Sequence, residues 1–323
     1  MKTKKQTSLQ VLLKHLAEAA QPLSVAKLYA LSNLDRDDLA QVQAMWPAMP
    51  GDRRASVVRH LADIVETNFE VNFEPVFRMA LADPEASVRQ AALDGLAEED
   101  DPTLIPTLVT LMQSDPAQDV RATAASSLGH FIYLGEIEEI PAARIAPALA
   151  ALRAVIASDE PLEIRRRAVE ALSFSGEQDV PEIIRNAYAS PDKAMRASAV
   201  FAMGSSADDQ WIATIISELE AQSPAMRYEA ARAAGELEAR TAVPTLARLL
   251  DDPDAEAQMM AVWALGQIGG DRARKLLTGI AQGDDEALAQ AATEALQELE
   301  GMHDARRDMP LFVFDPHADE EDE

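Results

Sequence analysis

One interval constrains this sequence more than any other feature: a short pattern returns about every 31 residues through most of the chain. The pattern is an apolar residue, an arginine, two variable residues and an alanine. The arginines are Arg89, Arg121, Arg165, Arg196 and Arg227, and degenerate copies follow at Gln258 and Ala289. The spacing is 31 residues from Arg165 onward, with one longer interval of 44 residues before it. A fixed period of this length predicts a stack of similar helical units.

Residues 223–253 show what one unit contains. Ser223 and Pro224 suit the N-cap and first position of a helix, and Met226, Ala230, Ala233 and Ala234 then fall on one face. A turn leads to a second helix with an apolar stripe formed by Leu246, Leu249 and Leu250. Neither helix can bury its stripe alone, so the unit is predicted to stack on copies of itself.

The marks of the repeat resemble those of the HEAT-repeat family, in particular the bacterial phycobilisome-lyase-like type. They are Asp-Pro or Ser-Pro, then Val-Arg or Met-Arg, then Ala-Leu-Gly, as at 264–266. The resemblance implies an all-α, right-handed α-solenoid of about 7–8 two-helix repeats. Members of the family are mostly interaction scaffolds, with a few enzymes among them.

The chain is predicted to have three parts. Residues 1–50 form a helical cap, with 1–6 disordered and Trp46 packing against the first repeat. Residues 51–300 form the solenoid, with an insertion near 131–144 that we expect to be a loop on one edge of the stack. Residues 301–323 form an acidic tail containing Leu311–Phe314, which could fold back or bind in trans. Phe69, Phe73 and Phe77 lie four residues apart and are predicted to be core.

Composition argues against nucleic-acid binding and against a membrane-spanning protein. The formal charge is −26, from 55 acidic and 29 basic residues, and such a field repels nucleic-acid phosphates. The chain has no cysteine, which favours a cytoplasmic location, and no run of membrane-spanning length. We therefore expect a cytoplasmic protein that binds neither nucleic acid nor membrane.

The repeated arginines have a structural explanation. Asp83, Asp115 and Asp159 each precede an arginine of the pattern by six residues. In HEAT-type repeats this spacing resembles the Asp/Arg ladder that joins neighbouring repeats. The alternative is an anion site built from the arginines. The predicted ladder residues are Asp83, Arg89, Asp115, Arg121, Asp159, Arg165, Arg196 and Arg227.

Catalytic motifs are scarce. No two of the five histidines stand at metal-ligand spacing, and none is followed by glutamate. His-Glu dyads mark deoxyhypusine hydroxylase, an enzyme branch of the resembled family, so a hydroxylase-like activity is disfavoured. A bilin lyase-like role is the remaining enzyme-associated alternative. We expect no catalytic residues, no metal and no cofactor.

The repeat register indicates a binding surface. Numbering the second helix from the apolar residue before the arginine places positions 1, 5, 8 and 9 in the core and positions 3, 7 and 10 opposite. In HEAT-type stacks this helix generally lines the concave side. Position 10 is glycine in three successive repeats (Gly204, Gly235 and Gly266), which predicts a smooth, exposed floor. The outward positions beside it hold Phe201, Tyr228, Arg232, Met259 and Trp263.

An exposed group of aromatic, Met and Arg side chains is typical of a protein interface. The sequence therefore predicts a protein-binding scaffold whose partner, given the acidic surface, has a basic rim. Two alternatives stay open: the group is buried, by a tightly curled superhelix or by the Leu311–Phe314 tail, or its exposure has no role. A HEAT-type nucleic-acid binder, as in some DNA glycosylases, would need a basic concave face, which these positions do not supply.

Overall fold

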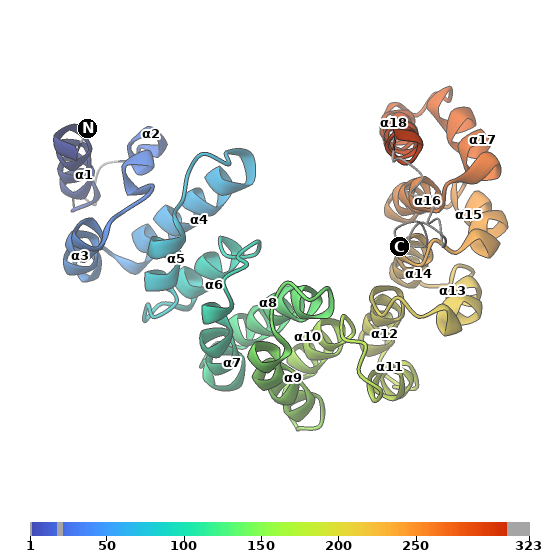
Figure 1. Cartoon of the computed structure of the whole chain (residues 1–323), viewed down its shortest axis with the longest axis horizontal. Coiled ribbons are helices and arrows are strands. Elements are labelled where there is room, and N and C mark those ends of the chain that lie inside the picture. The colour runs from blue at the N-terminus through green and yellow to red at the C-terminus, as the bar shows by residue number, and fades with distance from the viewer. Residues whose placement is uncertain (1, 18–21, 309–323) are drawn as a thin grey trace, which may run out of the picture. The chain divides into compact units, whose positions relative to one another are not determined.

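All regular structure in the described part of the chain is helical. In the computed structural model, which describes residues 2–17 and 22–308, helices are joined by short turns and that part of the chain contains no strand. The chain divides into two compact units, Met1–Ala189 and Ser190–Glu323. Within each unit helix pairs stack one after another, which confirms the predicted all-α solenoid (Figure 1).

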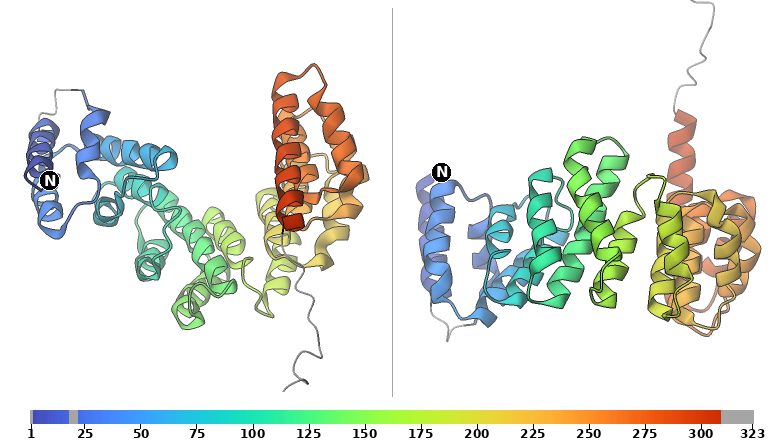
Figure 2. Two further views of the ribbon diagram at one scale, coloured as in Figure 1. Left: turned by 45° about the horizontal axis from the view of Figure 1, so that its top comes forward. Right: turned by 90° about the horizontal axis from the view of Figure 1, so that it is seen from below.

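In the first unit the second helices of successive repeats pack on one another. They are α4, α6, α8 and α10, and the first helices α5, α7 and α9 lie beside them (Figure 2). The bounds are α1 Lys2–Ala17, α2 Val25–Leu28, α3 Arg36–Met45, α4 Gly51–Thr67, α5 Glu74–Ala80, α6 Ala86–Asp94, α7 Ile105–Ser114, α8 Gln118–Glu136, α9 Ala142–Ile156, α10 Leu162–Leu172 and α11 Val180–Tyr188.

The second unit follows the same rule. The second helices α12, α14, α16 and α18 form one row, and α13, α15 and α17 form the other (Figure 1). The bounds are α12 Lys193–Ser205, α13 Ile212–Glu218, α14 Pro224–Glu236, α15 Val243–Leu249, α16 Ala255–Ile268, α17 Gly270–Ala281 and α18 Glu286–Asp308.

The repeat at 223–253 folds as its sequence predicts. Helix α14 begins at Pro224, directly after the N-cap Ser223, whose side chain makes no capping hydrogen bond. Met226 is 6% exposed, and Ala230, Ala233 and Ala234 are completely buried. Burying this alanine-rich face lets neighbouring second helices approach closely, which supplies the apolar contact that neither helix has alone.

The N-terminal segment differs from its prediction at the start. Helix α1 begins at Lys2, so residues 2–6 are helical and the prediction that 1–6 are disordered is wrong for them. Trp46 is 7% exposed and its Nε1 donates to a carboxylate oxygen of Asp83 at 2.7 Å, which joins the cap to the first repeats. The Leu311–Phe314 prediction lies outside the described residues.

The insertion near 131–144 does not form the predicted edge loop. Helix α8 continues through it to Glu136, and α9 begins at Ala142. Phe131 and Ile132 are buried, so the added residues extend the packed face of the helix. Glu136 accepts a hydrogen bond from the backbone N–H of Gly176 at 2.9 Å, which fixes the end of α8 against a turn of the same unit.

The three phenylalanines do not share one environment. Phe73 and Phe77 are each 1% exposed and pack edge to face, with ring centroids 6.4 Å apart. Phe69 is 95% exposed. The prediction that Phe69 is core is wrong because helix α4 ends at Thr67 and α5 begins at Glu74, so Phe69 lies in the turn and helical spacing does not apply to it.

Candidate functional site

The repeated arginines bond in two directions, as Arg89 shows. Its Nη1 donates to the backbone carbonyl oxygens of Asp83 at 2.7 Å and Pro84 at 3.0 Å, in the turn before its own helix. Its Nε and Nη2 donate to the carboxylate oxygens of Asp115, at 2.7 and 2.6 Å, in the turn of the next repeat. The arginine thus closes its own turn and holds the next one by a bidentate, charge-assisted pair.

Two further bidentate pairs of this kind join repeats. Arg54 donates to Asp83 at 2.7 and 2.8 Å, and Arg227 donates to Asp252 with both contacts at 2.6 Å. An aspartate six residues before an arginine therefore has two roles. The backbone carbonyl oxygen of the aspartate accepts from that arginine, while the carboxylate of the aspartate binds the arginine of the preceding repeat. Sequence spacing did not reveal this division, and it missed Arg54.

Arg121 and Asp159 depart from the pattern. Arg121 Nη1 bonds the backbone carbonyl oxygen of Asp115 at 3.2 Å, but its Nη2 pairs with Glu160 at 3.0 Å. Asp159 is exposed. The ladder role predicted for the Asp159 carboxylate belongs to its neighbour, because the side chain of Glu160 is the one that reaches Arg121.

Arg165 and Arg196 lack the aspartate pair. Arg196 Nη1 bonds the carbonyl oxygens of Ser190 and Pro191, at 3.2 and 3.4 Å, and the next repeat has Ala221 where others have aspartate. Arg165 has a buried Nε without a hydrogen-bond partner among the described residues. The bidentate pairs of the ladder therefore occur at Asp83 and Asp115, are missing for Arg165 and Arg196, and occur again at Asp252.

Asp83 is the most connected ladder residue. Besides Arg54, its carboxylate accepts from Trp46 Nε1 and from the backbone N–H of Glu85 at 2.9 Å. Burial acts to raise the pKa of Asp83, but the hydrogen bonds from Arg54, Glu85 and Trp46 outweigh it and hold the pKa below its ordinary value. The carboxylate therefore stays ionised in the folded protein down to acidic pH.

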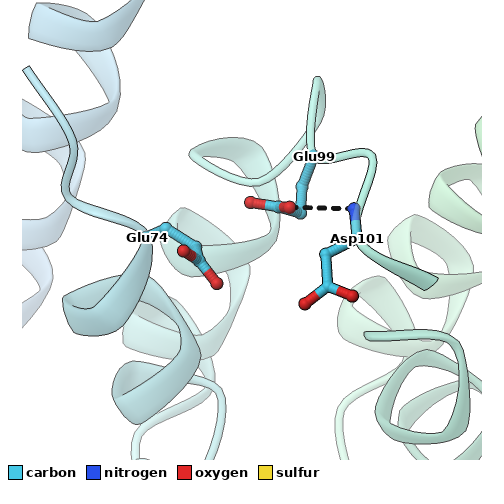
Figure 3. Close-up of side chains that lie close together, drawn as sticks. All are labelled: Glu74, Glu99 and Asp101. Carbon is cyan, nitrogen blue, oxygen red and sulfur yellow. Dashed lines mark hydrogen bonds between the residues drawn. The ribbon is translucent and has the colours of Figure 1, made fainter. Parts of the chain in front are cut away.

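One carboxylate of α5 meets two from the turn after α6. The ligand atoms of Glu74, Glu99 and Asp101 lie within 4.8 Å of one another (Figure 3). Arg78 contacts all three: it bonds Glu74, lies 2.9 Å from Asp101 and lies 3.9 Å from Glu99. With a guanidinium already among the carboxylates, the cluster is best described as an ion-pair network.

The predicted interface residues lie on consecutive second helices of the second unit: Phe201 on α12, Tyr228 and Arg232 on α14, and Met259 and Trp263 on α16. We call these five residues the 201–263 patch. Met259 is 37% exposed, whereas the other four side chains are partly buried. The prediction that all the apolar members are exposed is therefore wrong for Phe201, Tyr228 and Trp263.

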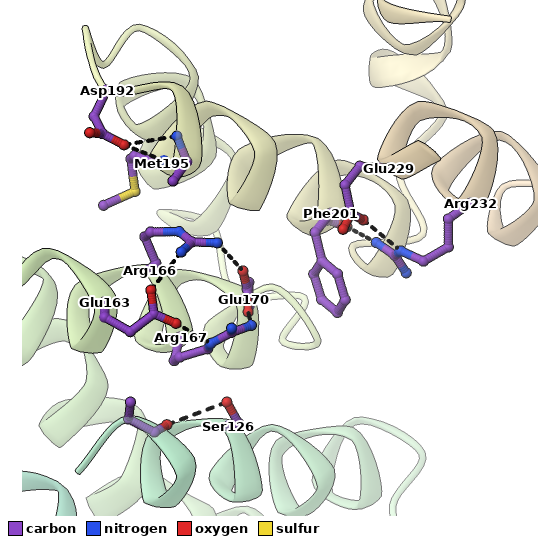
Figure 4. A network of polar contacts seen from close by, with 12 residues as sticks. Ser126, Glu163, Arg166, Arg167, Glu170, Asp192, Met195, Phe201, Glu229 and Arg232 are labelled. Carbon is purple, nitrogen blue, oxygen red and sulfur yellow. Dashed lines mark hydrogen bonds and ion pairs between the residues drawn. The ribbon is translucent and has the colours of Figure 1, made fainter. Parts of the chain in front are cut away.

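Contacts between neighbouring repeats account for this partial burial. The Arg232 guanidinium lies 3.8 Å above the centroid of the Phe201 ring, and Nη2 donates to the Phe201 carbonyl oxygen at 2.9 Å (Figure 4). Arg232 also pairs with Glu229 at 3.0 Å and with Glu236. Its charge is thus balanced by carboxylates on its own helix. Burial raises the pKa of Glu236, although Arg232 opposes that rise.

The glycines at position 10 are not an exposed floor. Gly204, Gly235 and Gly266 are all buried. A Cβ on Gly204 would lie 2.7 Å from the Cα of Ala233, and one on Gly235 would lie 2.6 Å from the Trp263 ring. The prediction failed because position 10 faces the next second helix, which the periodicity of one helix cannot reveal. These glycines let the helices of the patch pack closely.

The family model for HEAT repeats matches residues 42–129, 73–172 and 212–297, more than half of the chain. This chain belongs to the HEAT-repeat family. Its repeats contain the stacked helix pairs and the arginine pairs between turns described above.

Several solved structures are similar to this chain, and the first named here supports the helical solenoid fold. Yeast importin-β (Kap95p) is 13% identical, with a TM-score of 0.52, over 91% of this chain and 46% of that one. Human deoxyhypusine hydroxylase in complex with glycerol is 18% identical, with a TM-score of 0.36, over 93% of this chain and 98% of that one. A designed armadillo repeat protein is 21% identical, with a TM-score of 0.37, over 60% and 99%. At these identities the similarity concerns the fold alone.

No curated protein matches the chain. Among the helices that the structure describes, none has both the length and the apolar character needed to cross a membrane.

Figure 4 also shows how the HEAT repeats of the first unit use the same helix positions differently. On α10, Arg166 pairs with Glu163 at 2.6 Å, and Arg167 bonds Glu163 and Glu170, both at 2.9 Å. Ser126 on α8 bonds its own helix at 3.3 Å. The positions that carry aromatic residues and Met in the second unit hold polar residues or alanine on α6, α8 and α10, so these helices have no counterpart of the 201–263 patch.

Replacing Gly204 by alanine is expected to destabilise the second unit by about 1–2 kcal/mol. Forcing a methyl group against the Ala233 backbone costs about 1–3 kcal/mol, and the better helix propensity of alanine recovers at most about 1 kcal/mol. The control is Gly279→Ala on α17, where a Cβ meets nothing within 4 Å and stability should rise. Urea denaturation of both variants measures the effect, and the same sign in both would contradict the close packing.

Proposed function

We propose that this HEAT-repeat chain is a non-catalytic scaffold that binds a protein partner through the 201–263 patch. The observation that carries the proposal is the composition of the patch. Three successive second helices bring Phe, Tyr, Arg, Met and Trp together, with Met259 exposed among them. These residue types are enriched at the centres of protein interfaces.

The packing of the patch favours binding over burial. Its rings are partly buried by neighbouring repeats, so they are already held in place before a partner arrives. A fixed aromatic side chain loses little conformational entropy on association, which improves affinity. The partly exposed edges of Tyr228 and Trp263 and the sulfur of Met259 would then form the contact surface.

Charge suggests the nature of the partner. Arg232 is paired with Glu229 and Glu236, so it adds no net positive charge to the patch. The whole chain carries a formal charge of −26. We infer a partner with a basic rim around an apolar centre, whose association slows as salt increases.

The proposal includes the type of HEAT repeat and the face of the solenoid that binds the partner. The 31-residue spacing and the Ala-Leu-Gly mark suggest the short, phycobilisome-lyase-like type of HEAT repeat. The patch lies on the second helices, which in HEAT-type stacks line the concave side, so we infer that the partner binds there.

The test is a pull-down from cell lysate with the full chain and its Trp263→Ala variant. A partner captured by the wild type and by Ile137→Ala, but not by Trp263→Ala, is the expected result. Ile137 is 47% exposed in the first unit and is therefore a matched apolar control. Equal capture by all three proteins would remove the patch as the binding site.

A further inference from the structure

The first unit contains a surface cavity of about 320 Å³ between the end of α4, the start of α5 and the turn after α6. Phe73 and Phe77, each 1% exposed, are among its lining residues, so the cavity lies against the packed core of the first unit. Its volume is at the lower end of the range of about 300–1,000 Å³ typical of ligand pockets. A cavity of this size suits one side chain rather than a large ligand. Its other apolar walls are Val65, Val71 and Leu96.

The turn at 68–73 forms one wall of the cavity and also carries Phe69. This side chain is 95% exposed, the most exposed of the large apolar side chains described. The turn is anchored nearby: Asn72 donates its N–H to Ser32 Oγ at 3.1 Å and accepts from the Asn33 N–H at 2.8 Å. An exposed phenylalanine on an anchored turn that also lines a surface cavity with polar and apolar walls is a feature of interaction sites.

The rim of the cavity is acidic. Glu74 and Glu99 contribute to it, and Arg78 pairs with both but offsets only one of their charges. Glu98 also lines the cavity, is exposed, and has no ion pair or hydrogen bond among the described residues. An unpaired carboxylate beside a cavity with both polar and apolar walls attracts a cation that is joined to an apolar group.

We propose that Phe69, the cavity and Glu98 form a second docking site, distinct from the 201–263 patch. Its occupant is a short segment of another protein that inserts one aliphatic or aromatic side chain into the cavity. A neighbouring lysine or arginine of that segment pairs with Glu98, and Phe69 packs against the segment from the side. A second copy of this chain, at −26, has the wrong charge for this role, and so does the acidic segment 309–323 of the chain itself.

The test uses a displayed library of random 12-residue peptides, selected on the full chain and counter-selected on the double variant Phe69→Ala/Glu98→Lys. We expect enriched peptides that combine a large apolar residue with a lysine or arginine within a few positions. An absence of enrichment, or enrichment of acidic peptides, would overturn the proposal.

Fluorescence anisotropy of one enriched peptide then measures each contribution. Phe69→Ala and Glu98→Lys should each weaken binding at least tenfold without lowering the melting temperature, since both residues are exposed. Ile137→Ala, Glu139→Lys and Trp263→Ala should leave it unchanged. A synthetic 309–323 peptide should not displace the bound peptide. Displacement would assign the site to the chain's own end, and unchanged binding in both site variants would also contradict the proposal.

Discussion

Replacing Asp83 by alanine is expected to destabilise the first unit by about 3–5 kcal/mol. The substitution leaves Arg54, whose side chain is 8% exposed, buried without its carboxylate partner. It also removes the hydrogen-bond acceptor of Trp46 Nε1 and of the Glu85 backbone N–H. A buried cation left without its partner costs far more than the loss of a surface ion pair, whose typical value is below about 1 kcal/mol.

Urea denaturation followed by circular dichroism measures this cost. Asp159→Ala is the matched control, because Asp159 occupies the same repeat position but is exposed and leaves the arginine pair to Glu160. The control should change stability by less than about 0.5 kcal/mol. Similar losses in the two variants would show that the bidentate pair of Asp83 is not what stabilises the junction.

Truncating Trp263 is expected to weaken partner binding by at least about 2 kcal/mol, close to thirtyfold in Kd. Trp263 is the largest side chain of the 201–263 patch, and its ring lies against Gly235 of the preceding repeat. Removing it deletes both its own contact area and the support that it gives to the adjacent surface. Isothermal titration of the captured partner with wild type and Trp263→Ala measures the change.

A loss of stability has to be separated from a loss of contact in this variant. Because Trp263 is only partly buried, its truncation should cost less than the about 3–5 kcal/mol typical of a fully buried tryptophan. Met259→Ala is the companion variant, since Met259 is more exposed and should weaken binding with little change in melting temperature. Weaker binding only at temperatures where Trp263→Ala unfolds would assign the residue to the core.

The sequence contains enough information to predict the repeat but not the contacts between repeats. The 31-residue spacing and the alanines of α14 predicted which face is buried, because that face follows from the geometry of one helix. The role of Gly204 depends on how closely α14 approaches α12, and that distance is set by two helices together. The carboxylate of Asp83 likewise binds Arg54, which the six-residue spacing does not indicate.

The same limit explains why the predictions for Phe69 and for the insertion near 131–144 were wrong. Spacing of four residues predicted a common face for Phe69 and Phe73, but a helix has to continue through both for that prediction to hold. Here the helix ends at Thr67. Conversely, the residues added near 131 continue α8, because Phe131 and Ile132 supply further apolar positions in register. The cavity beside Phe69 is formed by three segments, so periodicity alone could not predict it.

The most direct test of the proposed function is hydroxyl-radical labelling of the chain, free and bound to its captured partner, read by mass spectrometry. Met259 is exposed in the free protein, and its sulfur reacts readily. If the 201–263 patch binds the partner, labelling of Met259 and Trp263 falls when the partner binds, while labelling of Tyr133, 47% exposed in the first unit, stays the same. Equal labelling of Met259 and Trp263 in the free and bound protein would contradict the proposed function.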